Sequence, residues 1–121
     1  MKFSSKNLTG VFLIEPTPIK DDRGVFRRHF CEKEFSDQGI IKDIKQCNVS
    51  ENPTAFTLRG FHYQIPPFSE GKTLSCLKGR IYDIIVDLRE DSPTFMQWVS
   101  FELNEVNRHS IHIAPGCANA F

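Results

Sequence analysis

The segment from Leu58 to Lys72 concentrates the side chains of this sequence that could carry out acid–base chemistry. Arg59 and His62 precede the pair Pro66-Pro67, and Lys72 follows it. Imidazole exchanges protons near neutral pH, whereas a guanidinium and an ammonium can hold an anion or a developing oxyanion. An isolated histidine is more often structural, so these residues by themselves leave His62 either as a candidate base or as an ordinary histidine.

A glycine inside this segment bears on how its side chains are arranged. Side chains alternate between the two faces of a strand, so a regular strand would place Arg59 and His62 on opposite faces. Glycine within a strand often marks a bulge, which shifts this alternation. Gly60 therefore predicts a bulge that could turn one of the two side chains toward the other.

Two other stretches carry polar side chains on one face. In the predicted strand 46–50, Gln46 and Asn48 share a face that meets either solvent or a polar pocket, and the alternation leaves both open. In the predicted strand 80–88, Asp83 and Asp87 lie opposite an apolar face that contains Tyr82, Ile84, Val86 and Leu88. The two carboxylates could orient a cation or an imidazole, but a solvated or ion-paired surface is the expectation for each.

Composition limits the classes of partner. The chain has 121 residues, 40% of them hydrophobic, which is enough for one domain with its own core. Fifteen basic residues balance fifteen acidic ones, so no net field favours nucleic acid or an anionic membrane, and any anion must be held by a local cluster.

The cysteines and the first residues indicate the compartment. The four cysteines show no CxxC spacing and are expected to be buried free thiols in a reducing compartment, without zinc or disulfides. The beginning of the chain lacks the apolar core of a signal peptide, and no run is long enough to span a membrane. We therefore expect a cytoplasmic protein.

The periodicity predicts short strands separated by Gly, Pro and Asp, with one helix from Glu32 to Gln38 that ends at Gly39. The predicted strands cover residues 11–14, 25–30, 46–50, 58–64, 73–77, 80–88, 98–103 and 110–114. This pattern predicts an all-β, antiparallel fold of the jelly-roll or sandwich-barrel type, as a single domain over residues 1–121.

Several motifs occur in one specific order. They are DRGVF at 22–26, QCNVS at 46–50, LRGFHYQ at 58–64, Lys72, GRIYDIIVDLR at 79–89, SPTF at 92–95 and PGCA at 115–118. In order and spacing, the chain from Val11 to Phe121 resembles the dTDP-4-dehydrorhamnose 3,5-epimerases, which are cupin-fold enzymes of deoxysugar biosynthesis. The combination of RGxHYQ, the lysine, VDLR and SPTF is specific, so the resemblance covers essentially the whole chain.

The resemblance implies an enzyme without metal or cofactor that acts on a nucleotide-diphosphate 4-keto-6-deoxysugar. His62 matches the family's base, which removes a proton next to the keto group. Lys72 matches the cation near the keto oxygen, where it would stabilise an enolate. Arg59 resembles a contact to the diphosphate, and Gln46 and Asn48 match residues that line the same cleft.

The resemblance also implies a homodimer. Arg23 and Phe26 correspond to an arm that, in the family, reaches the active site of the partner subunit. There the phenyl ring would pack near the base and the guanidinium would meet phosphate.

Three positions depart from the family pattern. Arg28 stands where a glutamate is usual, Cys47 where an aspartate is usual, and Asn119 where a histidine is usual. All three lie in segments that touch the substrate in the family. They indicate a different sugar, a different nucleotide or a reaction at a single carbon.

The family continues beyond the position of Phe121 with further strands, which supply a tyrosine that returns the proton and an aspartate that orients the base. Either these residues are a piece of a longer enzyme, or this is a short form that binds without completing an epimerisation. The first is expected, because a sheet that ends there would leave a long unpaired edge.

Other functions remain as alternatives. One is a catalytically silent cupin that binds a nucleotide sugar, and another is a related sugar-nucleotide keto-isomerase. A metal-dependent cupin would need several converging ligands, but no second histidine follows His62 in an HxH pattern, and His29, His109 and His112 lie in other segments.

Overall fold

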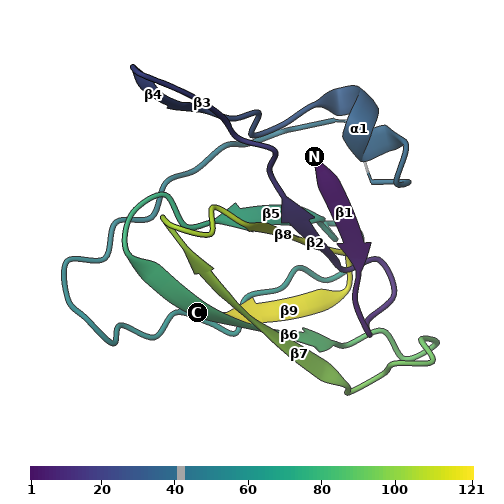
Figure 1. Ribbon diagram of the computed structural model, residues 1–121. Coiled ribbons are helices and arrows are strands. Elements are labelled where there is room, and N and C mark those ends of the chain that lie inside the picture. Colours follow the sequence, from purple (N-terminus) through teal and green to yellow (C-terminus); the bar gives the residue numbers. More distant parts are fainter. Residues whose placement is uncertain (41–42) are drawn as a thin grey trace.

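Two antiparallel sheets face each other in the computed structural model, which describes residues 1–40 and 43–121 (Figure 1). The first sheet has the order β1-β2-β8-β5, with bounds Lys2–Ser5, Phe12–Glu15, Ser110–Ile113 and Lys72–Ser75. The second has the order β7-β6-β9, with bounds Trp98–Asn104, Arg80–Asp87 and Cys117–Ala120. A separate hairpin joins β3 (Ile19–Asp21) to β4 (Gly24–Phe26) and precedes helix α1 (Glu32–Ser36).

The hydrophobic core lies between the two sheets. Ile111 and Ile113 from β8 meet Ile85 from β6 and Leu103 from β7, and all four side chains are fully buried. Such burial of branched aliphatic side chains supplies most of the favourable free energy of folding. The predicted all-β, jelly-roll fold is confirmed in its strands and facing sheets, although the sheets described here do not close into a barrel.

Helix α1 covers the outer side of the first sheet. Phe35 of the helix is buried in a second cluster with Ile14 of β2, and its ring meets that of Phe3 edge to face, with centroids 5.3 Å apart. The helix is shorter than predicted, because it ends at Ser36 and the chain turns through Gly39 with a φ of +73°. In the described part of the chain, this short helix is the only one, and it cannot span a membrane.

The face of β6 that is buried carries the two aspartates, whereas the opposite, apolar face was expected to be buried. Asp83 and Asp87 are fully buried between the sheets, whereas Tyr82 on the face predicted as apolar core is 59% exposed. The expectation that the two carboxylates lie on a solvated surface is therefore wrong. Alternation defines two faces of β6 but does not say which one meets the first sheet, and here the hydrogen bonds that the fold supplies allow both carboxylates to be buried.

Several other strand predictions differ from the structure, among them the predicted strand 58–64, which forms only an isolated bridge at His62. Residues 46–50 form no strand but an exposed irregular segment, which has no neighbouring strand to complete its backbone hydrogen bonds in the described residues. Conversely, β9 was not predicted, because Cys117, Ala118, Asn119 and Ala120 have low strand propensity, yet all four are buried beside β6.

The cysteines are free, as predicted, but they are not all buried. Cys76 and Cys117 are buried, Cys31 is half-buried and Cys47 is exposed. Cys47 is exposed because it lies in the irregular segment that was predicted to be a strand with an inward apolar face.

Asp87 organises the turn that follows β6. Its carboxylate accepts hydrogen bonds from the Arg89 guanidinium at 2.8 Å and from the hydroxyls of Ser92 and Thr94 at 2.6 Å each. Burial by itself would raise the pKa of Asp87, but these hydrogen bonds together hold it well below its ordinary value of 3.8. Arg89 also donates to the carbonyl of Thr9, so the network ties the turn to the beginning of the chain.

We expect Asp87→Ala to lower the free energy of unfolding by about 2–3 kcal/mol near neutral pH, because it removes the buried acceptor of the hydrogen bonds from Arg89, Ser92 and Thr94. Urea unfolding followed by circular dichroism measures this difference. Because the pKa of Asp87 is lower in the folded protein, its contribution is present above pH 3.8 and is lost as the pH falls below that value. A loss below about 1 kcal/mol would show that the turn does not depend on this network.

Candidate active site

The strand register directs three polar side chains into the space between the sheets. Lys72 on β5 pairs with Ile113, whose side chain is fully buried in the core, so Lys72 points the same way. On the facing sheet, Asn119 of β9 pairs with the buried Ile85, and Asp83 lies two residues before Ile85 on β6. The two sheets therefore bring an ammonium, a carboxamide and a carboxylate toward one another.

The segment from Arg59 to His62 runs antiparallel to β9. Arg59 exchanges two backbone hydrogen bonds with Phe121, at 2.7 and 2.9 Å, and His62 exchanges two with Asn119, at 2.8 and 3.1 Å. Between these two pairs, the segment contains two residues, 60 and 61, whereas β9 contributes only Ala120. The segment therefore has one residue more than the strand beside it. This is the bulge that Gly60 predicted, and it places Arg59 and His62 on one face, across from Asn119.

Only glycine fits at position 60. Its φ is +134°, a conformation that residues with a side chain rarely adopt. A Cβ atom there would lie 2.5 Å from Cβ and 2.6 Å from Cα of Ala120. The glycine in the RG pair therefore allows the segment to approach β9 closely enough for His62 to reach the face that Asn119 shares.

Asp83 lies at the buried end of this group. Its Oδ1 accepts a hydrogen bond of 2.9 Å from Nδ2 of Asn119, whereas its Oδ2 is buried and has no hydrogen-bond partner among residues 1–40 and 43–121. Burial raises the pKa of Asp83 to about 6, although the Asn119 hydrogen bond and the charge of Lys72 both act to lower it. An Asp with this pKa can hold or release a proton close to neutral pH.

Lys72 and His62 are accessible from solvent. The Lys72 side chain is 26% exposed, and its ammonium lies 3.3 Å from Oε1 of Glu70. His62 is exposed. An anionic ligand entering between the sheets would therefore meet an ammonium, an imidazole and the Arg59 guanidinium, which donates to Oδ1 of Asn52. The sequence analysis did not identify Glu70. Its position two residues before Lys72 could have indicated that the two side chains lie on the same face.

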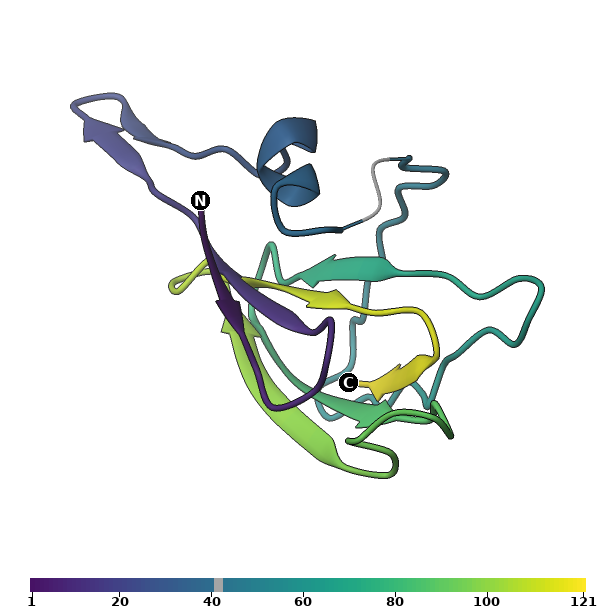
Figure 2. The same cartoon turned by 90° about the vertical axis from the view of Figure 1, so that its right-hand side faces the viewer.

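The other candidate residues lie outside this group. Arg23 and Phe26 belong to the β3–β4 hairpin, which projects away from the sheets (Figures 1 and 2). Phe26 is 72% exposed, and Arg23 pairs with Asp21 on the same hairpin. Arg28 pairs with Glu34 of α1. Gln46 and Asn48 contact each other weakly in the exposed irregular segment.

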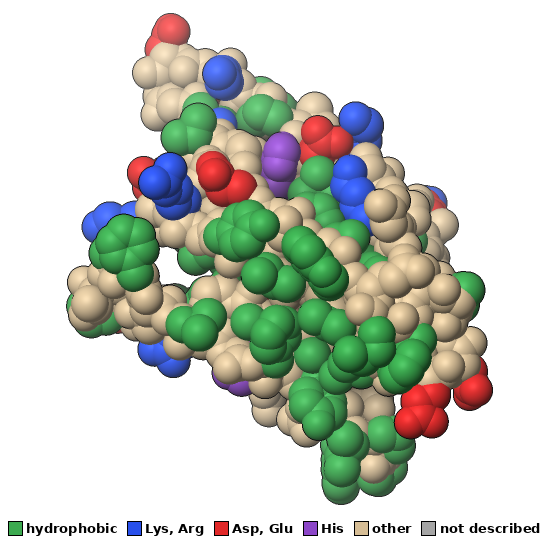
Figure 3. Space-filling view, turned by 90° about the horizontal axis from the view of Figure 1, so that it is seen from below, with side chains coloured by type: hydrophobic (Ala, Val, Ile, Leu, Met, Phe, Trp, Pro, Cys, Tyr) green, Lys and Arg blue, Asp and Glu red, His purple; other side chains and the backbone are tan. Residues whose placement is uncertain are grey.

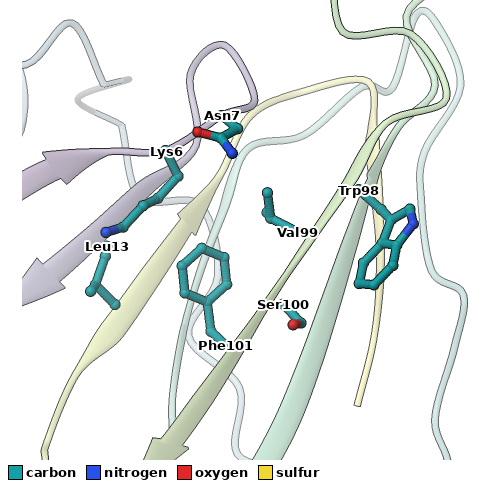
Figure 4. A pocket seen from close by; sticks show the side chains of 7 residues that line it. All are labelled: Lys6, Asn7, Leu13, Trp98, Val99, Ser100 and Phe101. Atoms are coloured by element: carbon teal, nitrogen blue, oxygen red, sulfur yellow. The ribbon is translucent and has the colours of Figure 1, made fainter.

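A surface pocket lies elsewhere, beside the β7 edge of the second sheet. Figure 4 shows its lining residues, none of which was predicted as a site residue. They are Lys6, Asn7, Leu13, Trp98, Val99, Ser100 and Phe101. No group of three histidine, cysteine or carboxylate side chains gathers as metal ligands among residues 1–40 and 43–121.

Comparison with known proteins places this arrangement in a family. The sequence model of the dTDP-4-dehydrorhamnose 3,5-epimerases matches residues 5–121. The chain belongs to this family. It is 38% identical over 125 residues to the dTDP-4-dehydrorhamnose 3,5-epimerase of Sinorhizobium fredii, covering 100% of this chain and 62% of that protein. The chain therefore spans about three fifths of the length of that curated relative.

Solved structures of the family share the fold. The Bacillus anthracis dTDP-4-dehydrorhamnose 3,5-epimerase, with TDP and PPi bound, has a TM-score of 0.95 and 38% identity, over 99% of this chain and 69% of that one. The Legionella pneumophila enzyme, in complex with dTDP-4-keto-L-rhamnose, has a TM-score of 0.82 and 32% identity, over 99% of this chain and 63% of that one. These neighbours confirm the predicted cupin-type jelly roll.

Proposed function

We propose that this protein is an epimerase of nucleotide-diphosphate 4-keto-6-deoxysugars that acts by removing a proton next to the keto group. The observation that carries the proposal is the strand register, in which Lys72 of the first sheet pairs with the inward-facing Ile113 and His62 pairs with Asn119 of the second sheet. A base and an ammonium that reach the same bound substrate are what proton removal next to a carbonyl requires. The names of the relatives support the same reaction class.

Each side chain has a part that follows from its chemistry. The imidazole of His62 takes the proton, and the electrons of the C–H bond move into a carbon–carbon double bond as the keto oxygen becomes negative. Lys72 stabilises that oxygen by its charge, and Arg59 holds the diphosphate. Return of a proton to the opposite face of the carbon inverts the centre. Asn119 holds Asp83 in place through a buried hydrogen bond.

The reaction can be tested without knowing which centre is inverted. The full-length protein is incubated in deuterium oxide with dTDP-4-keto-6-deoxyglucose, and NMR follows deuterium at the carbons on both sides of the keto group. Incorporation at C3 or C5 supports the proposal. Tight binding of the nucleotide sugar without any incorporation would instead support the silent binding cupin.

We also propose that the protein is a homodimer in which the β3–β4 hairpin of each subunit extends to the other. Phe26 projects with this hairpin and is 72% exposed, and its cross-strand partner Ile19 is 65% exposed, so the hairpin presents adjacent apolar side chains to solvent. On the outer face of the second sheet, Tyr82 is 59% exposed and Trp98 is 61% exposed. Figure 3 shows hydrophobic side chains gathered on the side of the molecule where β6, β7 and β9 lie.

We expect sedimentation equilibrium to give a dimer at micromolar protein concentration, because the exposed aromatic side chains need a partner surface. Phe26→Asp should weaken the dimer by at least about tenfold in dissociation constant, whereas Phe68→Asp, at another exposed aromatic position, should not. A stable monomer at these concentrations would contradict the proposed homodimer.

A further inference from the structure

The Lys72 ammonium has an ion-pair partner that the proposed reaction does not use. Oε1 of Glu70 lies 3.3 Å from Nζ of Lys72, and the Glu70 side chain is 49% exposed. An ion pair so open to solvent shifts an equilibrium by only several-fold, so Glu70 decides the position of the ammonium between arrangements of similar free energy. Lysine also has a long flexible side chain that can reach more than one position.

A second carboxylate faces Lys72 from the other sheet. Asn119 donates to Oδ1 of Asp83, and in the described part of the chain the buried Oδ2 has no hydrogen-bond partner. A buried carboxylate oxygen without a donor is unfavourable, so a nearby ammonium is drawn to it. In the structure the two groups form no ion pair, and Lys72 remains with Glu70.

We propose that Glu70 is a positioning residue that holds the Lys72 ammonium toward solvent, against the attraction of Asp83. In this position the ammonium meets the keto oxygen of a substrate that enters between the sheets, a consequence that rests on the proposed function. Without Glu70, the ammonium turns inward and pairs with Oδ2 of Asp83. It is then shielded from solvent and displaced from the substrate.

The position of the ammonium can be measured without a substrate. Acetic anhydride acetylates accessible lysines, and peptide mass spectrometry gives the rate for each one. Lys45, whose side chain is 80% exposed, serves as the reference in the same sample. We expect Glu70→Gln to slow acetylation of Lys72 at least about threefold relative to Lys45, because an ammonium bound to a buried carboxylate is shielded.

Two further variants separate this cause from a general change in structure. Asp83→Asn should leave the rate of Lys72 within about twofold of wild type, because Glu70 still holds the ammonium outward. The double variant Glu70→Gln/Asp83→Asn should recover most of the lost rate, because the inward partner is gone. An unchanged rate in Glu70→Gln, or equal slowing in the double variant, would overturn the proposal.

The same displacement should appear in turnover. In the deuterium-exchange assay, Glu70→Gln should lower kcat about tenfold with KM nearly unchanged, because the ammonium no longer sits where the oxyanion forms. Glu90→Gln, at an exposed position in the turn after β6, is the charge-matched control and should behave as wild type. An unchanged kcat in an active protein would overturn the positioning role, whereas a wild type without turnover would overturn the proposed function and leave the acetylation result standing.

Discussion

His62→Asn is expected to abolish exchange of the sugar hydrogens at C3 and C5 with solvent, by a factor of at least about a thousand. A general base contributes about a hundred- to ten-thousandfold in rate, and the amide of asparagine cannot take the proton. Affinity for the nucleotide sugar should stay within about tenfold of wild type, because the amide keeps some hydrogen bonding. Deuterium incorporation followed by NMR measures the first quantity, and isothermal titration calorimetry measures the second.

The fold should tolerate this substitution. His62 is tied to Asn119 through backbone atoms, at 2.8 and 3.1 Å, and its own side chain is exposed. His109→Asn is a matched control at a histidine whose nearest carboxylate is Glu15, and it should exchange hydrogen at the wild-type rate. Exchange near the wild-type rate in His62→Asn would mean that another group takes the proton.

Lys72→Met is expected to lower kcat at least about a hundredfold, with KM changed by less than about tenfold. An ammonium beside the keto oxygen contributes little to the neutral carbonyl and far more to the enolate, so its loss appears in turnover. Removal of one such donor typically costs about 3–4 kcal/mol. Steady-state kinetics with the 4-keto sugar nucleotide separates kcat from KM.

The opposite kinetic result would assign a different role to this lysine. A lysine that binds the diphosphate weakens substrate binding when it is lost, in a way that depends on salt, and leaves the rate of bound substrate nearly intact. Lys78→Met, at an exposed lysine in the turn after β5, controls for the loss of one positive charge. A large rise in KM with unchanged kcat for Lys72→Met alone would therefore move Lys72 from the keto oxygen to the diphosphate.

The sequence determined those features that depend on neighbouring residues. Short apolar strands, broken by Gly, Pro and Asp, predicted the antiparallel fold, because strand and turn preferences act over a few residues. Gly60 predicted the bulge beside His62 for the same reason, since a positive φ and the absence of a Cβ are properties of that one residue. The motif order also predicted the family to which the chain belongs.

The position of the arm and of the polar segment required the structure. Arg23 and Phe26 lie on a projecting hairpin, and Gln46 and Asn48 lie in an exposed segment, so none of them joins the polar group between the sheets within this chain. Motif spacing gives their order along the chain but not their distance from His62. That distance depends on the paths of the loops and hairpins outside the sheets. These paths can differ between sequences that share the same motif order.

The tertiary structure alone decided which face of β6 is buried. Local alternation gave Asp83 and the apolar Tyr82 opposite faces but could not choose between them. Asp83 is buried because Asn119, 36 residues away in the chain, donates a hydrogen bond to it, and because Lys72 approaches from the other sheet. A buried carboxylate is stable only when other parts of the chain supply its hydrogen-bond partners. Here those partners come from distant strands, and no short stretch of sequence predicts which distant strands will pair.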